Sequence, residues 1–206
     1  IKPYKKIKEV KYSTKEVKIK WFHDGTLNAS ANCIDRHLKD KKDKTAIIWV
    51  GDDPKDSQKI SYKQLHQKVS KAANGLKKLG IQKGDRVAFS MRNYPEWMFC
   101  YMAITSIGGI VVPLNSWWKG DEIEYGLTNS EAKLFIGDEE RLDRLEGRLT
   151  DLPKIAVRSN KPHHQDIDFY NLIKDAAIEL ENPIDIKPED DWAYEEISKR
   201  LEYDSS

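Results

Sequence analysis

Short apolar runs and amphipathic stretches alternate along most of this chain from residue 45 onward. An apolar run bounded by polar or turn residues is typical of a buried strand. The stretch after Ser61 instead places apolar residues three and four positions apart and ends at Gly80, which predicts a long helix capped by Ser61. The predicted strands are TAIIWVG (45–51), KISY (59–62), RVAFSM (86–91), IVVPL (110–114), KLFIG (133–137) and KIAVRS (154–159).

Helical patterns separate most of these runs. The predicted helices are 61–79, 95–107, 121–130, 139–149 and 169–180. Strands separated by helices of this length favour right-handed βαβ units. We therefore predict an α/β fold with a mainly parallel sheet and flanking helices. Three parts are expected: an extended arm and short helix (1–43), the α/β unit (44–178) and an acidic tail (179–206).

The N-terminal arm combines alternating apolar residues with many lysines. Val17, Ile19 and Trp21 alternate with lysines, which predicts a half-buried extended strand. Residues 29–39 are expected to form one short helix, capped by Asn28 or Ser30. The arm and the short helix precede the first predicted strand of the sheet.

Charge is balanced over the whole chain but not at its ends. The formal net charge is +1, while residues 1–20 hold eight lysines against two glutamates and residues 179–206 hold ten acidic and three basic residues. No basic recognition helix or aromatic RNA-binding motif accompanies the arm, so we do not expect a nucleic-acid partner. The two cysteines form no CxxC pair, which suits free thiols in the cytoplasm.

One uncharged stretch, Trp97 to Leu114, has a length that could cross a bilayer. Gly108 and Gly109 interrupt it and Pro113 lies near its end. A buried helix, a glycine turn and a buried strand explain this pattern better than a membrane span. We expect no membrane span.

The stretch from Trp21 to His37 carries the side chains most suggestive of chemistry. Cys33 and His37 would share a helix face, with His23 as the nearest third ligand, but zinc sites need three or four ligands. A Cys33–His37 nucleophile pair would lack an oxyanion hole. The alternative is scaffold, with Cys33 buried and Asp35 and Arg36 as a surface or inter-segment ion pair.

Trp117, Trp118 and Lys119 form the second candidate site. They follow the end of a predicted strand, where open α/β sheets place ligand crevices. Aromatic faces and a lysine could bind a cofactor there, although tandem tryptophans are more often core packing. His163 and His164 lie in a polar loop and are expected to be solvated.

The strings IKWFHDGTLNASANCIDRHL, TAIIWVGDDP, ISYKQLHQKV and ANGLKKLGIQKGDRV closely resemble the start of AMP-forming acetyl-CoA synthetases, up to about residue 87. From 88 to about 191 the chain is more similar to medium- and long-chain fatty acyl-CoA ligases of the same adenylate-forming superfamily. The resemblance implies the N-terminal subdomain of that fold. It also implies that the stretch from Trp21 to His37 is scaffold, with no metal and no catalytic residue.

The resemblance further implies a parent reaction in which a carboxylate, ATP and CoA give acyl-CoA, AMP and pyrophosphate with magnesium. The family's glycine-rich phosphate loop is missing, because the last glycine of the chain is Gly147. We therefore expect a truncated or partial synthetase, with no cofactor of its own and no activity alone, so whether the chain is itself an enzyme stays open. The alternative is a non-enzymatic module that associates with itself or with a complementary synthetase fragment.

Overall fold

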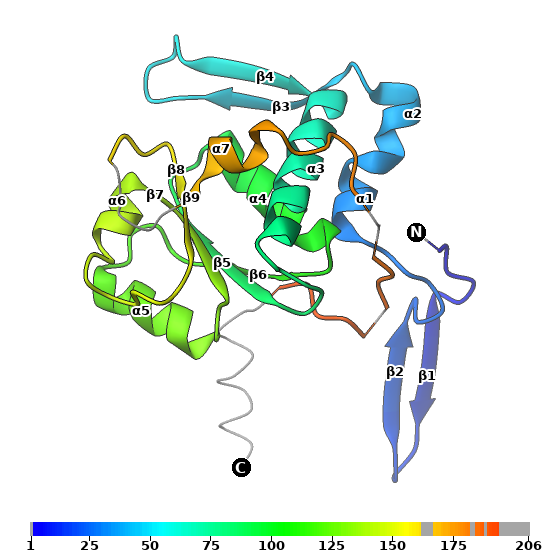
Figure 1. Ribbon diagram of the computed structural model, residues 1–206. Helices are drawn as coiled ribbons and strands as arrows, with labels where there is room; N and C mark the ends of the chain where they lie inside the picture. Colours follow the sequence, from blue (N-terminus) through cyan, green and yellow to red (C-terminus); the bar gives the residue numbers. More distant parts are fainter. Residues whose placement is uncertain (1, 162–166, 182–183, 188, 194–206) are drawn as a thin grey trace.

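The structure is a computed structural model that describes residues 2–161, 167–181, 184–187 and 189–193. A parallel five-stranded sheet in the order β6-β5-β7-β8-β9 forms its centre (Figure 1), which confirms the predicted fold class. The strands of this sheet are β5 (Arg86–Ser90), β6 (Ile110–Pro113), β7 (Leu134–Asp138), β8 (Lys154–Val157) and β9 (Ile167–Asp168).

Helices cover both faces of the sheet. One face packs against α3 (Tyr62–Lys78), α4 (Pro95–Ser106) and α7 (Phe169–Lys174), and the other against α5 (Gly120–Asn129) and α6 (Glu139–Asp143). Successive side chains of β5 alternate between the two cores: Val87 and Phe89 face the first, and Ala88 the second. The central residues of β5, β6, β7 and β8 are therefore apolar, because both faces of these strands are buried.

The long helix α3 begins and ends where its sequence predicts. The Ser61 hydroxyl accepts a hydrogen bond from the backbone of Gln64, whose side chain accepts one in return, which forms a capping box. Gly80 has a φ of +86°, the left-handed conformation that favours glycine after a helix. The helices predicted over 139–149 and 169–180 are shorter in the structure and end at Asp143 and Lys174.

The uncharged stretch from Trp97 to Leu114 is confirmed as helix, glycine turn and strand. It contains most of α4, a turn in which Gly108 has a φ of +70°, and β6 at one edge of the sheet. Within the described ranges, no helix is long and apolar enough to cross a membrane. Part of the β6 edge is covered, since the Val111 N–H donates to the Trp192 carbonyl and Val111 pairs with Ala193.

The N-terminal part differs most from the prediction. Residues 29–39 form a broken segment, α1 (Ala29–Cys33), the short helix η1 (Asp35–His37) and α2 (Leu38–Lys41), because Ile34 leaves the helical path and enters the core. Asn28 caps α1, as one of the two alternatives predicted. Cys33 is exposed, so its predicted burial is wrong, and Ile34 is the buried residue.

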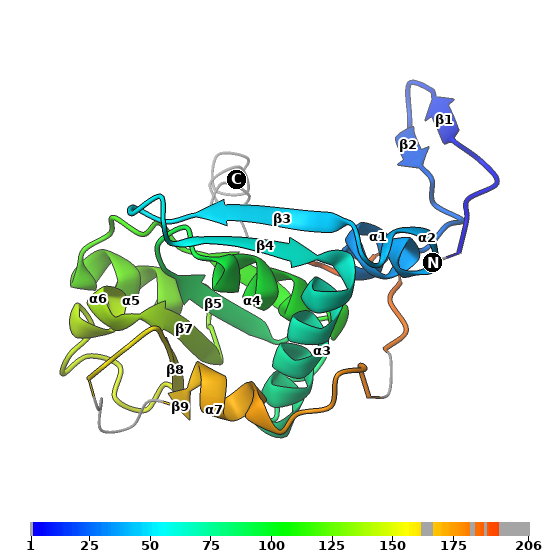
Figure 2. The same ribbon diagram turned by 90° about the horizontal axis from the view of Figure 1, so that it is seen from above.

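Two antiparallel hairpins complete the chain. The first joins β1 (Lys8–Tyr12) to β2 (Val17–Trp21) and projects from the body in both views (Figures 1 and 2). The strand predicted at Val17–Trp21 is confirmed, but all five residues are exposed rather than half-buried. The second hairpin, β3 (Thr45–Val50) and β4 (Ser57–Ser61), lies across the top of Figure 1.

Candidate functional site

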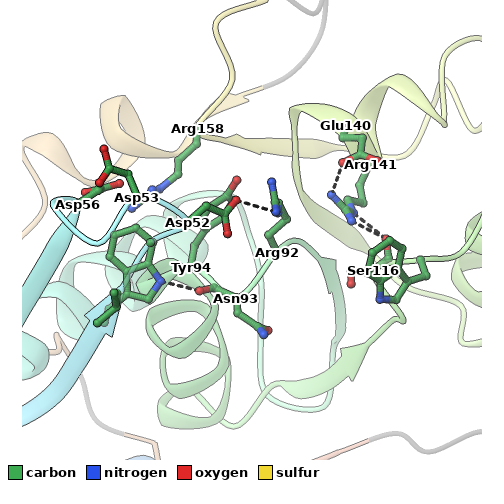
Figure 3. Close-up of a pocket in the computed structure, with 14 residues that line it drawn as sticks. Asp52, Asp53, Asp56, Arg92, Asn93, Tyr94, Ser116, Glu140, Arg141 and Arg158 are labelled. Atoms are coloured by element: carbon green, nitrogen blue, oxygen red, sulfur yellow. Dashed lines mark hydrogen bonds and ion pairs between the residues drawn. The ribbon is translucent and has the colours of Figure 1, made fainter.

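A crevice of about 770 Å³ lies at the carboxyl ends of the parallel strands (Figure 3). It is lined by residues that follow β5, β6, β7 and β8, and by the turn between β3 and β4. The chain leaves β5 for a helix on one face of the sheet and leaves β7 for a helix on the other. Neighbouring strands whose connections diverge in this way create the usual ligand crevice of open α/β sheets.

Asp138, the last residue of β7, joins chain segments that line this crevice. Its buried carboxylate accepts hydrogen bonds from the backbone N–H groups of Arg92 (3.0 Å) and Arg141 (3.2 Å). The first bond joins the ends of β5 and β7, and the second caps α6. The carboxylate also forms a buried ion pair with the Arg141 guanidinium at 3.2 Å. Asp138 therefore fixes the relative position of two strand ends.

Two arginines hold the loop that carries the tandem tryptophans. The Arg141 guanidinium donates to the Ser116 carbonyl at 2.6 and 2.9 Å. Arg144 donates to the same carbonyl at 3.0 Å and to that of Trp118 at 2.6 Å. Hydrogen bonds from charged donors are roughly twice as strong as neutral ones. The path of the loop is thus set by α6 and the residue after it.

Arg158 forms the opposite wall. It has a φ of +50°, and its guanidinium lies over the rings of Tyr94 and Trp49 at 4.4 and 5.0 Å. Its Nε lies 3.2 Å from the buried carboxylate of Glu96, which also accepts a hydrogen bond of 2.7 Å from the Tyr170 hydroxyl. Burial, and then the bond to Glu96, raise the pKa of Tyr170, so this hydroxyl stays neutral and donates.

The β3–β4 hairpin closes one side of the crevice. The Trp49 indole N–H donates to the Asn93 carbonyl at 2.7 Å, which ties β3 to the loop after β5. Arg92 and Asp52 form an ion pair at 2.9 Å across the same gap, with both side chains more than half exposed. An exposed pair of this kind contributes about 0–1 kcal/mol. Trp49 is therefore the stronger of the two attachments.

The lining of the crevice is balanced in charge. It contains three arginines (Arg92, Arg141 and Arg158) and four carboxylates (Asp52, Asp53, Asp56 and Glu140). All three arginines already pair with a protein carboxylate. Phosphate sites in proteins usually offer free cations or a run of backbone N–H groups. The described residues therefore do not form a ready cradle for the phosphates of a nucleotide.

The structure separates the three residues of the predicted Trp117–Lys119 site. Trp117 is 83% exposed and lines the crevice. Trp118 is partly buried and packs against the second core and Gly126. Lys119 is exposed at the start of α5, where its backbone N–H donates to Glu122 at 2.7 Å. Only Trp117 of the three reaches the crevice.

The sequence analysis missed Arg92, Arg141 and Arg158, which line the crevice, and Asp138, which bonds to two of them beside it. Arg92, Asp138 and Arg141 follow a predicted strand within a few positions, and Arg158 is the next-to-last residue of one. This position at a strand end is the signal that could have found them. The sequence analysis placed Arg141 in a predicted helix and Arg158 in a predicted strand and gave none of the four a role in a site. Only the order of the strands in space shows that these four residues meet.

The residues of the stretch from Trp21 to His37 do not converge on one site. His23 lies 3.4 Å from Glu9 in the arm, Cys33 is exposed, and the His37 ring lies against Tyr62. Asp35 lies 3.4 Å from His66 of α3 rather than beside Arg36, which donates to Asn32. Among the described residues no group of three or more His, Cys, Asp and Glu side chains could hold a metal. His163 and His164 lie outside the described residues.

Comparison with known proteins adds to this geometry. The sequence model of the family described as "AMP-binding enzyme" matches residues 34–198. Acetyl-coenzyme A synthetase of Pseudoalteromonas translucida is 45% identical over 138 residues, 67% of this chain and 21% of the relative. The enzyme of the same name from Yersinia pseudotuberculosis is 45% identical over 140 residues, 68% of this chain and 22% of the relative. The chain thus spans about a fifth of the length of these relatives.

Solved structures with the same fold are also ligases. The crystal structure of an acyl-CoA synthetase from Brucella canis superposes with a TM-score of 0.72 at 24% identity and covers 81% of this chain and 30% of that one. The anthranilate CoA ligase AuaEII, solved in complex with anthranoyl-AMP, gives a TM-score of 0.72 at 24% identity over 82% of this chain and 32% of that one. At this identity the likeness establishes the fold alone.

Proposed function

Because this chain belongs to the AMP-binding enzyme family, we propose that it serves as the N-terminal α/β lobe of an AMP-forming acyl-CoA synthetase. The parent reaction joins a carboxylate to CoA at the expense of ATP, with release of AMP and pyrophosphate. The resemblance to acetyl-CoA synthetases over two thirds of the chain supports this reaction class. The fold that the chain shares with an acyl-CoA synthetase also supports this proposal.

In this proposal the chain does not catalyse adenylation by itself. The observation that carries this part is the engagement of every arginine lining the crevice by a protein carboxylate. Stabilising phosphoryl charge needs preorganised donors or cations aimed at the phosphates. The sequence holds no glycine after Gly147 that could form a phosphate loop. ATP and magnesium therefore do not fit this lobe alone, and residues outside it would have to hold them.

The crevice would instead contribute one wall of a ligand site. Trp117 offers an exposed aromatic face at its rim, and Arg92 is the arginine most easily drawn from its partner because the pair is exposed. Lys119 lies outside the crevice lining and would contact only a part of the ligand that extends beyond it, and Trp118 would anchor the loop. We propose that the ligand is an anionic, partly aromatic portion of CoA or the adenylate.

Acetate is the acid that the comparisons favour, because the relatives that match at 45% identity are acetyl-coenzyme A synthetases. A fatty acid is the alternative, supported by the ligase-like residues from 88 onward. The two free cysteines suit the reducing cytoplasm, where we place the protein.

Exchange of labelled pyrophosphate into ATP tests this proposal. The purified chain, assayed with acetate and with medium- and long-chain acids, is expected to show no exchange above a protein-free blank. A full-length acetyl-CoA synthetase in the same buffer provides the positive control. Exchange that follows the purified chain through chromatography would overturn the proposed lack of adenylation activity.

A non-enzymatic assembly module is the second candidate. The observation in its favour is the number of large apolar side chains that the arm and its base expose, among them Tyr12, Val17, Trp21 and Leu27. Such a module would bind the complementary part of a synthetase without any restored exchange. Binding together with restored exchange would favour the lobe instead.

A further inference from the structure

The hairpin of β1 and β2, here called the arm hairpin, has two chemically different faces. Directly opposed residues of an antiparallel pair project from the same face. The pairs Val10–Ile19 and Tyr12–Val17, with Trp21 opposite Lys8, make one face apolar. The pairs Glu9–Lys20 and Lys11–Lys18 make the other face basic. The sequence alternation thus sorts apolar and basic residues onto opposite sides of one hairpin.

The apolar face is open to solvent. Tyr12 and Val17 are each 68% exposed, Ile19 is 47% exposed and Trp21 is 55% exposed. The hairpin stands away from the body in both views (Figures 1 and 2), and the two strands pack mainly on each other. An isolated two-stranded hairpin is only marginally stable in water. A partner that accepts both apolar and cationic groups would stabilise it.

The base of the hairpin fixes its direction. The Asp24 carboxylate accepts hydrogen bonds from the backbone N–H groups of Lys5 and Lys6, and Lys2 and Thr26 exchange two backbone hydrogen bonds. The rings of Tyr4 and Phe22 lie 4.6 Å apart beside these bonds and add aromatic surface next to the apolar face. The hairpin is therefore held at its base and free along its length within the described part of the chain.

Area argues against a second copy of this chain as the partner. Five residues at about 3.4 Å each, on two strands about 4.8 Å apart, give a face of roughly 170 Å². A footprint of this size is small beside the roughly 600 Å² of accessible surface that each partner buries in the smaller stable complexes. Two arms that each carry eight lysines against two glutamates would also repel each other. A dimer through this face would be weak.

The charge and composition of the arm hairpin fit an anionic lipid surface better than a second copy of the chain. Aromatic side chains prefer the boundary between headgroups and acyl chains, and lysines near a membrane surface are attracted to anionic headgroups. The Lys8 ammonium nitrogen lies over the Trp21 ring, 4.8 Å from its centre, so the apolar face carries one cation held against its largest aromatic side chain. A small apolar face suffices for reversible binding at a lipid interface.

We propose that the arm hairpin is a peripheral membrane-binding element that inserts its apolar face into the headgroup region of anionic bilayers. The basic face then lies within about one Debye length of the surface, where Lys11, Lys18 and Lys20 are still attracted to it. The body of the protein stays in water. Its membrane association would be reversible and would weaken as salt concentration rises.

Flotation of the full chain with vesicles tests this assignment. The probes are vesicles of phosphatidylcholine mixed with phosphatidylglycerol, and vesicles of phosphatidylcholine alone, at low and high salt. The expected result is binding to the anionic vesicles at low salt, much weaker binding to the neutral ones, and loss of binding at high salt.

Matched variants separate the hairpin from the rest of the surface. Ile19→Ser is expected to weaken binding about tenfold, and Lys20→Gln about fivefold. The controls are Ile48→Ser and Lys59→Gln on the β3–β4 hairpin, which change an isoleucine that is more exposed (68%) than Ile19 (47%) and an exposed lysine, and which should leave binding unchanged. Ile19 and Lys20 belong to neither core cluster, so circular dichroism should show an unchanged fold.

Several outcomes would overturn the proposal. These are no flotation with anionic vesicles, equal binding to both kinds of vesicle, or equal losses in the control variants. A dimer that light scattering detects without lipid, and that Ile19→Ser abolishes, would make this face a contact between copies instead. Retention by a DNA duplex without vesicle binding would assign the lysines to nucleic acid.

Discussion

The Asp138 carboxylate lies 3.2 Å from the guanidinium of Arg141, and the two side chains are only 5% and 4% exposed. The same carboxylate caps α6 and holds the backbone after β5, while the same guanidinium holds the loop after β6. One buried ion pair therefore connects three strand ends around the crevice. Its loss should affect both the stability of the fold and the shape of the site.

Replacing Asp138 tests this connection. Asp138→Ala leaves the buried Arg141 charge with only the half-exposed Glu140 carboxylate as its partner, and removing one member of a buried pair typically costs about 3–5 kcal/mol. Urea denaturation should show a free energy of unfolding lower by about this amount. The control is Glu140→Ala, which removes a half-exposed partner of the same arginine and should cost less than about 1 kcal/mol. Similar losses in both variants would contradict the special role of Asp138.

Trp49 should hold the β3–β4 hairpin over the crevice. Trp49→Phe removes the hydrogen bond to the Asn93 carbonyl and weakens the contact with Arg158, which should cost about 1–2 kcal/mol. Hydrogen exchange of β3 and β4 should become faster than in the unchanged protein. Ile48→Ala, at a position that is 68% exposed, is the matched control and should change stability by less than about 0.5 kcal/mol.

His66 should make stability depend on pH. The hydrogen bond to Asp35 raises the pKa of His66, burial opposes this, and the negative charges of Asp35 and Glu179 raise it further. The resulting stabilisation is fully present below the unfolded pKa of about 6.5 and is lost as pH rises through the raised pKa of the folded state. The difference in unfolding free energy between the protein and a His66→Asn variant should fall across that interval. A difference independent of pH would contradict the interaction.

The two cysteines should react at very different rates. Cys33 is exposed, while burial, and then the charge of Glu96, raise the pKa of Cys100, which is 1% exposed. A thiol reagent such as DTNB should modify one thiol rapidly in the native protein and the second only after unfolding. Cys33→Ser should remove the rapid phase. Two rapid thiols would show that the helix around Cys100 opens readily.

The pattern of apolar residues predicted the strands of the central sheet and the ends of α3 because both features depend on residues that are close together in the sequence. The central residues of β5 to β8 are buried on both faces and are therefore apolar, and the Ser61 cap and Gly80 mark the ends of α3 within the sequence itself. These features depend on residues that are near neighbours along the chain.

Other features depend on contacts between distant residues. Apolar residues and lysines do alternate in the arm, which is why the sequence predicted a half-buried strand. The sequence of the arm does not show whether another element covers its apolar face, and all five residues of β2 are exposed. The helix at 29–39 breaks because the core takes Ile34, and this exposes Cys33. The boundary near residue 179 stays a prediction, although Asn74 and Lys83 bind described residues beyond it.

Complementation of pyrophosphate exchange tests the central claim most directly. The chain is mixed with an acetyl-CoA synthetase polypeptide that lacks its first fifth, and exchange is measured with acetate, magnesium and ATP. We predict no exchange from either polypeptide alone and measurable exchange from the mixture, reduced when Asp138→Ala is used. Exchange by the chain alone, or a stable complex of the two polypeptides that shows no exchange, would contradict the account.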